Sequence, residues 1–325
     1  MLKTKIILIG KSIMLAKCID TVLNDFKEVF VITNDKNIKR RFKKKIHFIQ
    51  IDKIKKIKPD YLFSVLNDQI LPKTYLNKVK KFALNFHDGP LPKYAGLFSS
   101  SWSIYNNEKI HGVCWHKIEK KIDTGDILEE RKFRIKNNDT AYNIDAKGVI
   151  IGLKLFNKIL IDLKKNNLYF KKQNLKKRSY FGKNQFSKLL KKLKDNENNK
   201  NLIRSLIVSP EKLKIIHNLF KISIDINKLK KKLNFKNNFK KKMDETNVKK
   251  LLNFVNITIK TNFKYKKNNL SQIALNNHYK WDSLSHAKLL SAIEKKFKIS
   301  INEKNIDSFS NLRLIYNYLN KIKVI

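Results

Sequence analysis

Two segments of the sequence contain polar side chains whose types and spacing could serve an acyl transfer. Asn85 and His87 lie two residues apart at the end of an apolar run, residues 82–86, so a strand there would project both side chains to the same side. Asp123 lies in a second segment, KKIDTGDIL. Amide and imidazole N–H groups stabilise charge on an oxygen, and a carboxylate orients an imidazole. On their own, an Asn and a His at a strand end are more often structural, so the interpretation depends on Asp123.

Short apolar runs alternate with helical patterns, which predicts an α/β fold with a Rossmann-like, mostly parallel sheet. The carboxyl ends of parallel strands gather at one edge of such a sheet, where ligands bind. A long helix is predicted from Thr140, with Asn138 or Asp139 as its cap. The predicted strands are residues 6–9, 29–32, 46–51, 61–65, 82–86, 112–118 and 127–135.

The segments NFHDGPLPKYAG and IDTGDIL together resemble the formyltransferase family that includes methionyl-tRNA formyltransferase and the N-terminal domain of 10-formyltetrahydrofolate dehydrogenase. The resemblance covers about residues 1–180. It implies that Asn85, His87 and Asp123 are catalytic, that 10-formyltetrahydrofolate is the formyl donor and that an amino group is the acceptor.

The segment DQILP resembles the folate-binding segment of the same family. It implies that Gln69, Ile70 and Leu71 contact the pterin, partly through backbone groups.

The implied reaction gives each catalytic residue a task. An amine attacks the formyl carbon, so negative charge develops on the formyl oxygen, and each preorganised donor at that oxygen contributes about 3–4 kcal/mol. Asn85 supplies an amide donor, and a protonated His87 supplies a charged one. Asp123 favours that protonated form and fixes the tautomer. No metal is required, and His111 and His116 are interpreted as surface or core residues.

Two departures from the family pattern bear on the acceptor. Ala95 stands where transfer-RNA formyltransferases typically have Arg, and no run of strands after residue 180 suggests their C-terminal β-barrel. We therefore expect a small or carrier-bound amine as the substrate. Methionyl-tRNA formyltransferase, a 10-formyltetrahydrofolate hydrolase and a non-catalytic folate- or carrier-binding protein remain as alternatives.

The segment WDSLSHAKLLSAIEKKF resembles acyl or peptidyl carrier proteins, in which D-S-L marks the attachment serine. The resemblance implies that a phosphopantetheinyl transferase attaches 4′-phosphopantetheine to Ser283. A helix N-terminus suits an attached phosphate. Alternatively, Ser283 is an N-cap in an ordinary helical bundle. Carrier proteins usually present an acidic recognition helix, whereas residues 246–325 contain 15 Lys or Arg and 4 Asp or Glu.

The 325 residues allow an α/β domain and a second small domain. We expect a catalytic domain over residues 1–182, a Lys- and Asn-rich helical connector over 183–246, and a small all-α carrier-like bundle over 247–325.

The net charge of +45 is spread along the whole chain. We interpret it as compositional bias on solvated faces and do not expect a nucleic-acid partner. Cys18 and Cys114 are too few for a disulfide framework or a metal site. No segment has the length of a membrane helix or a signal peptide, so we expect a cytoplasmic protein without a membrane partner.

Overall fold

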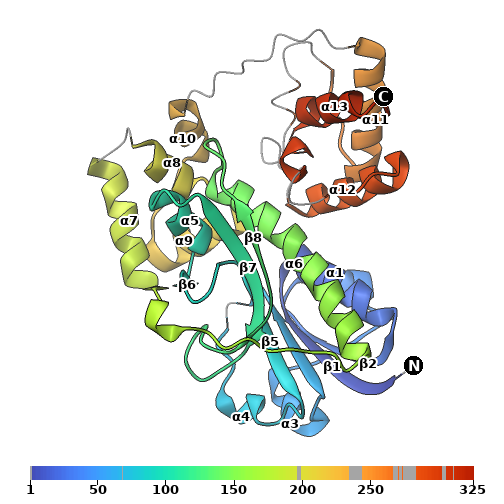
Figure 1. Cartoon of the computed structure of the whole chain (residues 1–325), viewed down its shortest axis with the longest axis vertical. Helices are drawn as coiled ribbons and strands as arrows, with labels where there is room; N and C mark the ends of the chain where they lie inside the picture. The colour runs from blue at the N-terminus through green and yellow to red at the C-terminus, as the bar shows by residue number, and fades with distance from the viewer. Residues whose placement is uncertain are drawn as a thin grey trace. The chain divides into compact units, whose positions relative to one another are not determined.

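The computed structural model describes residues 2–67, 69–195, 199–233, 244–265, 270, 273, 283–301, 305–309 and 311–325. The chain divides into two compact units, Met1–Asn234 and Phe235–Ile325 (Figure 1). Within the described residues, no helix has the length and apolar character that crossing a membrane requires.

The first unit is built on a sheet that has, in its described part, seven strands in the order β3-β2-β1-β4-β5-β7-β8. Strands β1 to β5 pair in parallel, and β7 and β8 are antiparallel. The predicted mostly parallel α/β fold is therefore confirmed. The strands are β1 (Leu2–Gly10), β2 (Phe26–Ile32), β3 (His47–Phe48), β4 (Tyr61–Val65), β5 (Phe82–His87), β7 (Ile110–Lys117) and β8 (Ile127–Arg134).

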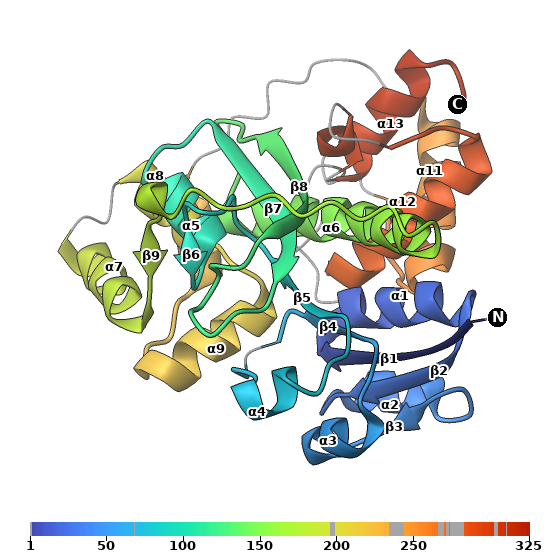
Figure 2. The same cartoon turned by 60° about the horizontal axis from the view of Figure 1, so that its bottom comes forward.

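Helices cover both faces of this sheet (Figure 2). Alternate residues of β1 point to opposite faces, so Ile6 and Leu8 join the core beneath α1 (Ser12–Leu23) and α6 (Ala141–Lys164). Ile7 and Ile9 instead pack with the face covered by the 3-10 helix η1 (Ile51–Lys53), α3 (Ile54–Ile57) and α4 (Lys73–Leu76). The strand expected over residues 46–51 is shorter because η1 begins at Ile51. Helix α2 (Lys36–Phe42) follows β2.

Thr140 caps α6, so the predicted caps Asn138 and Asp139 are wrong by one or two positions. The Thr140 hydroxyl accepts from the Asn143 N–H, and the Asn143 side chain accepts from the Thr140 N–H at 2.9 Å, which forms a capping box. Asp139 instead accepts from the Lys147 ammonium at 2.8 Å.

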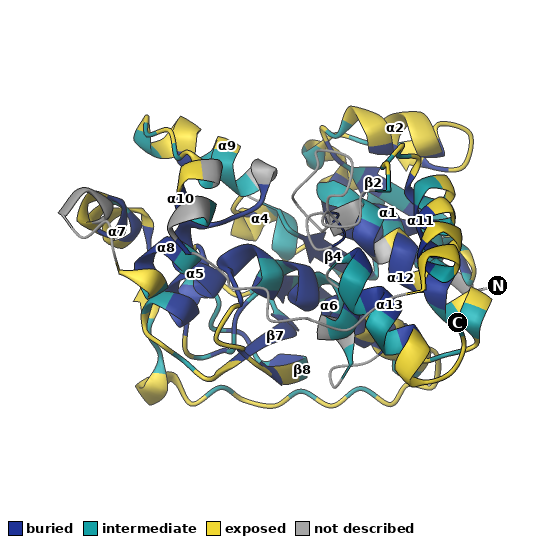
Figure 3. Ribbon diagram, turned by 90° about the horizontal axis from the view of Figure 1, so that it is seen from above, coloured by how far each residue is buried: buried dark blue, intermediate teal, exposed yellow. Residues whose placement is uncertain are grey.

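The segment expected as a connector contributes to the core of the first unit. Its helices are α7 (Lys183–Asp195), α8 (Lys200–Leu206), α9 (Pro210–Phe220) and α10 (Ile226–Lys232). Phe186, Leu202 and Ile216 are buried in the same core as the sheet, and α8 packs on α5 (Ser99–Tyr105), which is buried along most of its length (Figure 3). The first unit therefore extends to Asn234 rather than to the expected residue 182.

The second unit contains α11 (Glu245–Ile259), α12 (Ser283–Phe297), η3 (Ile306–Phe309) and α13 (Leu312–Lys321). Apolar residues at helical spacing, including Val248 and Val255, are buried on α11. The Asn311 side chain caps α13 by accepting from Leu314 N–H at 2.9 Å. These helices pack against one another, and Ser283 is the first residue of α12.

Gly152 of α6 lies against the Phe86 ring, and its carbonyl accepts from the Trp115 indole N–H at 3.0 Å. A Cβ at this position would overlap that ring. We expect Gly152→Ala to lower the free energy of unfolding by about 1–3 kcal/mol, because overpacking outweighs the gain in helix propensity. Chemical denaturation measures the change. Gly148→Ala is the control on the same helix, since its Cβ would meet a Val113 methyl at 3.0 Å. Equal midpoints for the two variants would contradict this packing.

Candidate active site

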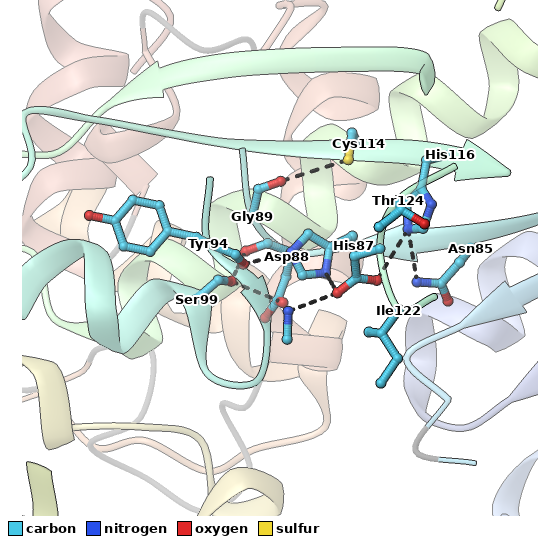
Figure 4. Close-up of polar contacts among 12 residues, drawn as sticks. Asn85, His87, Asp88, Gly89, Tyr94, Ser99, Cys114, His116, Ile122 and Thr124 are labelled. Atoms are coloured by element: carbon cyan, nitrogen blue, oxygen red, sulfur yellow. Dashed lines mark hydrogen bonds and ion pairs between the residues drawn. The ribbon is translucent and has the colours of Figure 1, made fainter. Parts of the chain in front are cut away.

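The carboxyl end of β5 brings Asn85 and His87 opposite β7. In the antiparallel register Asn85 pairs with His116, and His87 pairs with Cys114. Directly opposed residues have neighbouring side chains, and Asn85 Nδ2 lies 3.4 Å from His116 Nε2. Figure 4 shows the Asn85, His87 and His116 side chains close to the segment that carries Ile122 and Thr124.

The loop between β7 and β8, residues 119–126, presents Asp123 to this strand end. Asp123 has a φ of 56°, a left-handed conformation that is uncommon for a residue with a side chain. The Gln173 side chain holds the loop by donating to the carbonyls of Asp123 and Gly125, at 3.2 and 2.6 Å. Gly125 leaves no room for a Cβ, which would overlap the Lys117 carbonyl. The loop conformation therefore depends on glycine at residue 125.

The Asp123 carboxylate is enclosed by polar groups from three parts of the chain. Its Oδ2 accepts from Gly96 N–H at 2.8 Å and lies 3.6 Å from His87 Nδ1, while its Oδ1 lies 3.4 Å from His116 Nε2. Burial alone would raise the pKa of Asp123, but the charge of His87 and the contacts with His116 and Gly96 hold that pKa well below its usual range. Asp123 is thus an ionised carboxylate.

Each histidine has a defined orientation. His87 Nε2 lies 2.9 Å from the Tyr94 carbonyl and its Nδ1 faces Asp123, so the imidazolium is the form in which both ring nitrogens can donate. His116 Nδ1 lies 2.7 Å from the Lys117 carbonyl. It must therefore carry a proton, which leaves the lone pair of a neutral His116 ring on Nε2. That nitrogen faces both Asn85 and Asp123.

The structure brings the three residues predicted to be catalytic together and places His116 beside them. His116 is 2% exposed, which agrees with the core position that the sequence allows, but it also contacts both Asn85 and Asp123, which the sequence does not predict. The signal in the sequence was its place near the end of a predicted strand, directly before the Asp123 loop. Within the described part of the chain, no three His, Cys, Asp or Glu side chains are arranged to hold a metal ion.

The predicted folate contacts lie after β4 and differ in exposure. Gln69 lines a pocket of about 280 Å³. Ile70 is 76% exposed, whereas the Leu71 side chain packs in the core with Ile7 and Leu62. A ligand at this segment could therefore reach Leu71 through its backbone rather than its side chain. The pocket is also lined by Ile9, Gly10, Lys11, Ile32, Thr33, Asn34, Asp35 and Asn67.

Asn85, His87, His116 and Asp123 all fall within the part of the chain that matches a family model. Residues 16–159 match the family described as formyl transferase. The bifunctional polymyxin resistance protein ArnA of Wigglesworthia glossinidia brevipalpis is 36% identical over 118 residues, which cover 36% of this chain and 18% of that protein. The methionyl-tRNA formyltransferase of Finegoldia magna is 33% identical over 132 residues, covering 41% of this chain and 43% of the relative. The matches span less than half of either curated relative.

Solved structures share the fold over more of the chain. The N-formyltransferase from Helicobacter canadensis, in complex with folinic acid and dTDP-3-aminofucose, has 29% identity and a TM-score of 0.54, and the match covers 63% of this chain and 81% of that one. The sugar 3N-formyl transferase WlaRD, with dTDP and 5-N-formyl-THF, has 27% identity and a TM-score of 0.51, covering 64% and 80%. Residues 16–159 are thus similar to the formyl transferase family, and the solved N-formyltransferases share the fold of this part of the chain.

Proposed function

We propose that this chain transfers a formyl group from 10-formyltetrahydrofolate to an amine. The observation that carries the proposal is the convergence of Asn85, His87 and His116 on the buried Asp123 carboxylate at the end of β5. Two solved relatives contain folinic acid or 5-N-formyl-THF, which supports a formylated folate as the donor.

The reaction forms one bond and breaks another. The amine nitrogen attacks the formyl carbon, and the electron pair of the C=O bond moves to the formyl oxygen. When the tetrahedral intermediate collapses, the bond between that carbon and the folate nitrogen breaks. The amine loses a proton and the folate nitrogen gains one, so atoms and charge balance. The site must therefore stabilise an oxyanion and move a proton.

We assign these tasks to the four residues from their contacts. Asn85 is the direct amide donor to the formyl oxygen, because both ring nitrogens of His87 already face acceptors. His116 Nε2 is the proton acceptor when the ring is neutral, and the imidazolium that then forms is paired with Asp123 Oδ1, 3.4 Å away. Asp123, with its low pKa, is a poor proton acceptor. Its carboxylate stabilises the positive charge that develops on the attacking nitrogen, and protonated His87 holds it in place.

The acceptor that we propose is an amine on a phosphopantetheine arm. Ser283 begins α12, a helix of 15 residues in a separate compact unit of helices, and a helix N-terminus favours an attached phosphate. An arm on the same chain would raise the local concentration of the amine. A free amino sugar is the second candidate, because the Helicobacter canadensis relative contains dTDP-3-aminofucose.

Loss of the His116 ring tests the division of tasks. We expect His116→Ala to lower kcat for formyl transfer on the order of 100-fold while KM for the folate changes little, because a proton acceptor acts in the transition state. Steady-state kinetics with each substrate in turn measures both constants. His47→Ala is the control, since His47 is exposed on β3. A variant with normal kcat would remove His116 from the proposed mechanism.

The attachment of an arm is tested by intact mass. After incubation with coenzyme A and a phosphopantetheinyl transferase, we expect the chain to gain the mass of one 4′-phosphopantetheine. Ser283→Ala should gain none, whereas Ser291→Ala, on the same helix, should gain it fully. If the natural sequence gains no mass, the tethered acceptor is wrong. Assay with dTDP-3-aminofucose then tests the amino sugar.

A further inference from the structure

A lysine from outside residues 16–159, the part that matches the family model, lies between two carboxylates, one of which belongs to the residue directly after His87. Lys212, on α9, places its ammonium 3.0 Å from Asp88 Oδ2 and 2.8 Å from Asp145 Oδ1. The Ser100 hydroxyl lies 3.4 Å from the same nitrogen. The Lys212 side chain is only 19% exposed, and the side chains of Asp88 and Asp145 are similarly enclosed. This cluster joins α9 and α6 to the residue that directly follows His87.

Asp88 is held by its backbone as well as by its carboxylate. The Asp88 carbonyl lies 2.9 Å from His111 Nε2 and also accepts from the Ser99 hydroxyl. Ser103 Oγ lies 2.8 Å from His111 Nδ1. Burial lowers the pKa of His111 to about 4, although Asp88 opposes that shift, so neutral His111 donates through Nε2 to Asp88 and accepts from Ser103. Fixing Asp88 in this way also fixes where the backbone of His87 lies.

Asp88 is a second carboxylate beside His87, and the two groups interact electrostatically. Burial would raise the pKa of Asp88, but the positive charges of Lys212 and His87 hold it well below its usual range. Burial raises the pKa of Asp145 despite Lys212. Among the described residues, the titratable groups that act on this cluster of Lys212, Asp88 and Asp145 are His87, His111 and Cys114.

We propose that Lys212 is a positioning residue for the formyl-transfer site: it binds the Asp88 carboxylate away from His87, so that Asp123 alone pairs with the His87 ring. This role rests on the proposed function, because it supposes that His87 and Asp123 act as a pair. Lys212 lies outside residues 16–159, the part of the chain that matches the family model. The helices after α6 would then support the catalytic residues as well as the core.

The charge of the cluster predicts how the loss of activity on replacing Lys212 depends on pH. With Lys212 present, one ammonium faces two carboxylates. If Lys212 is lost, one of the two carboxylates can bind a proton at low pH, and the cluster then keeps the same net charge. Asp145 is the better candidate to bind that proton, because its pKa is already raised. As pH rises that proton leaves, and two unpaired carboxylates then act on His87. The defect should therefore grow with pH.

Lys212→Met is the direct test. We expect kcat to fall on the order of 100-fold at about pH 8 and roughly tenfold at about pH 6, with KM for the folate nearly unchanged. Adding Asp145→Asn to this variant should recover most of the loss at the higher pH, because it replaces one unpaired carboxylate by a neutral group. Lys212→Arg keeps the charge and should retain most of the activity. Lys214→Met, exposed on the same helix, is the control.

Folding and activity are separated in this design. Removing one partner of a buried ion pair can destabilise a protein strongly, so circular dichroism checks that each variant is folded at both pH values. A folded Lys212→Met variant with unchanged kcat, or one with an equal loss at both pH values that Asp145→Asn does not relieve, would overturn the positioning role. If the natural sequence itself transfers no formyl group to any tested amine, the proposed function fails instead.

Discussion

A carboxylate that is removed from water is stable only with cations or N–H donors close to it. In the first unit, several segments of the chain come together around Asp123 and provide such partners. Its neighbours come from β5, from β7 and from the Gly96 backbone. No two of these segments are adjacent in sequence, so only the folded sheet brings them together around the carboxylate. The left-handed conformation at Asp123 and the absence of a side chain at Gly125 are local consequences. An unpaired carboxylate at this depth would instead take up a proton.

A second set of carboxylates, which includes the residue directly after His87, is also compensated by a nearby cation. Asp88 and Asp145 are compensated by Lys212, which belongs to a segment that the sequence had suggested was a connector. The two sets differ in their cations. Asp123 is surrounded by imidazoles, whose charge can change during a reaction, whereas Asp88 faces an ammonium that stays charged. We infer that the residues around Asp123 take part in the chemistry and that those around Lys212 hold them in position.

The mostly parallel sheet, the proximity of Asn85, His87 and Asp123, and the helices of the second unit could be predicted because each rests on local patterns. Apolar runs predict buried strands. The segments NFHDGPLPKYAG and IDTGDIL contain Asn85, His87 and Asp123. His116 could not be assigned to the site, because the antiparallel register that places it opposite Asn85 is a tertiary property. Lys212 was even harder to assign from sequence, since 124 positions separate it from Asp88. In a sequence so rich in lysine, composition gave no reason to single it out. The cap of α6 was missed because Asp139 pairs with Lys147, which leaves Thr140 to accept from the helix.

The fate of the formyl carbon tests the central claim most directly. A donor labelled with carbon-13 at the formyl group, mixed with the chain and a candidate amine, can be followed by NMR. The four-residue site predicts that the label appears as a formamide on the amine, and that Asp123→Asn slows its appearance on the order of 100-fold or more. Glu119→Gln, exposed in the same loop, should leave the rate unchanged. Label that appears only as formate while amine is present, or an Asp123→Asn variant as fast as the natural sequence, would contradict the account.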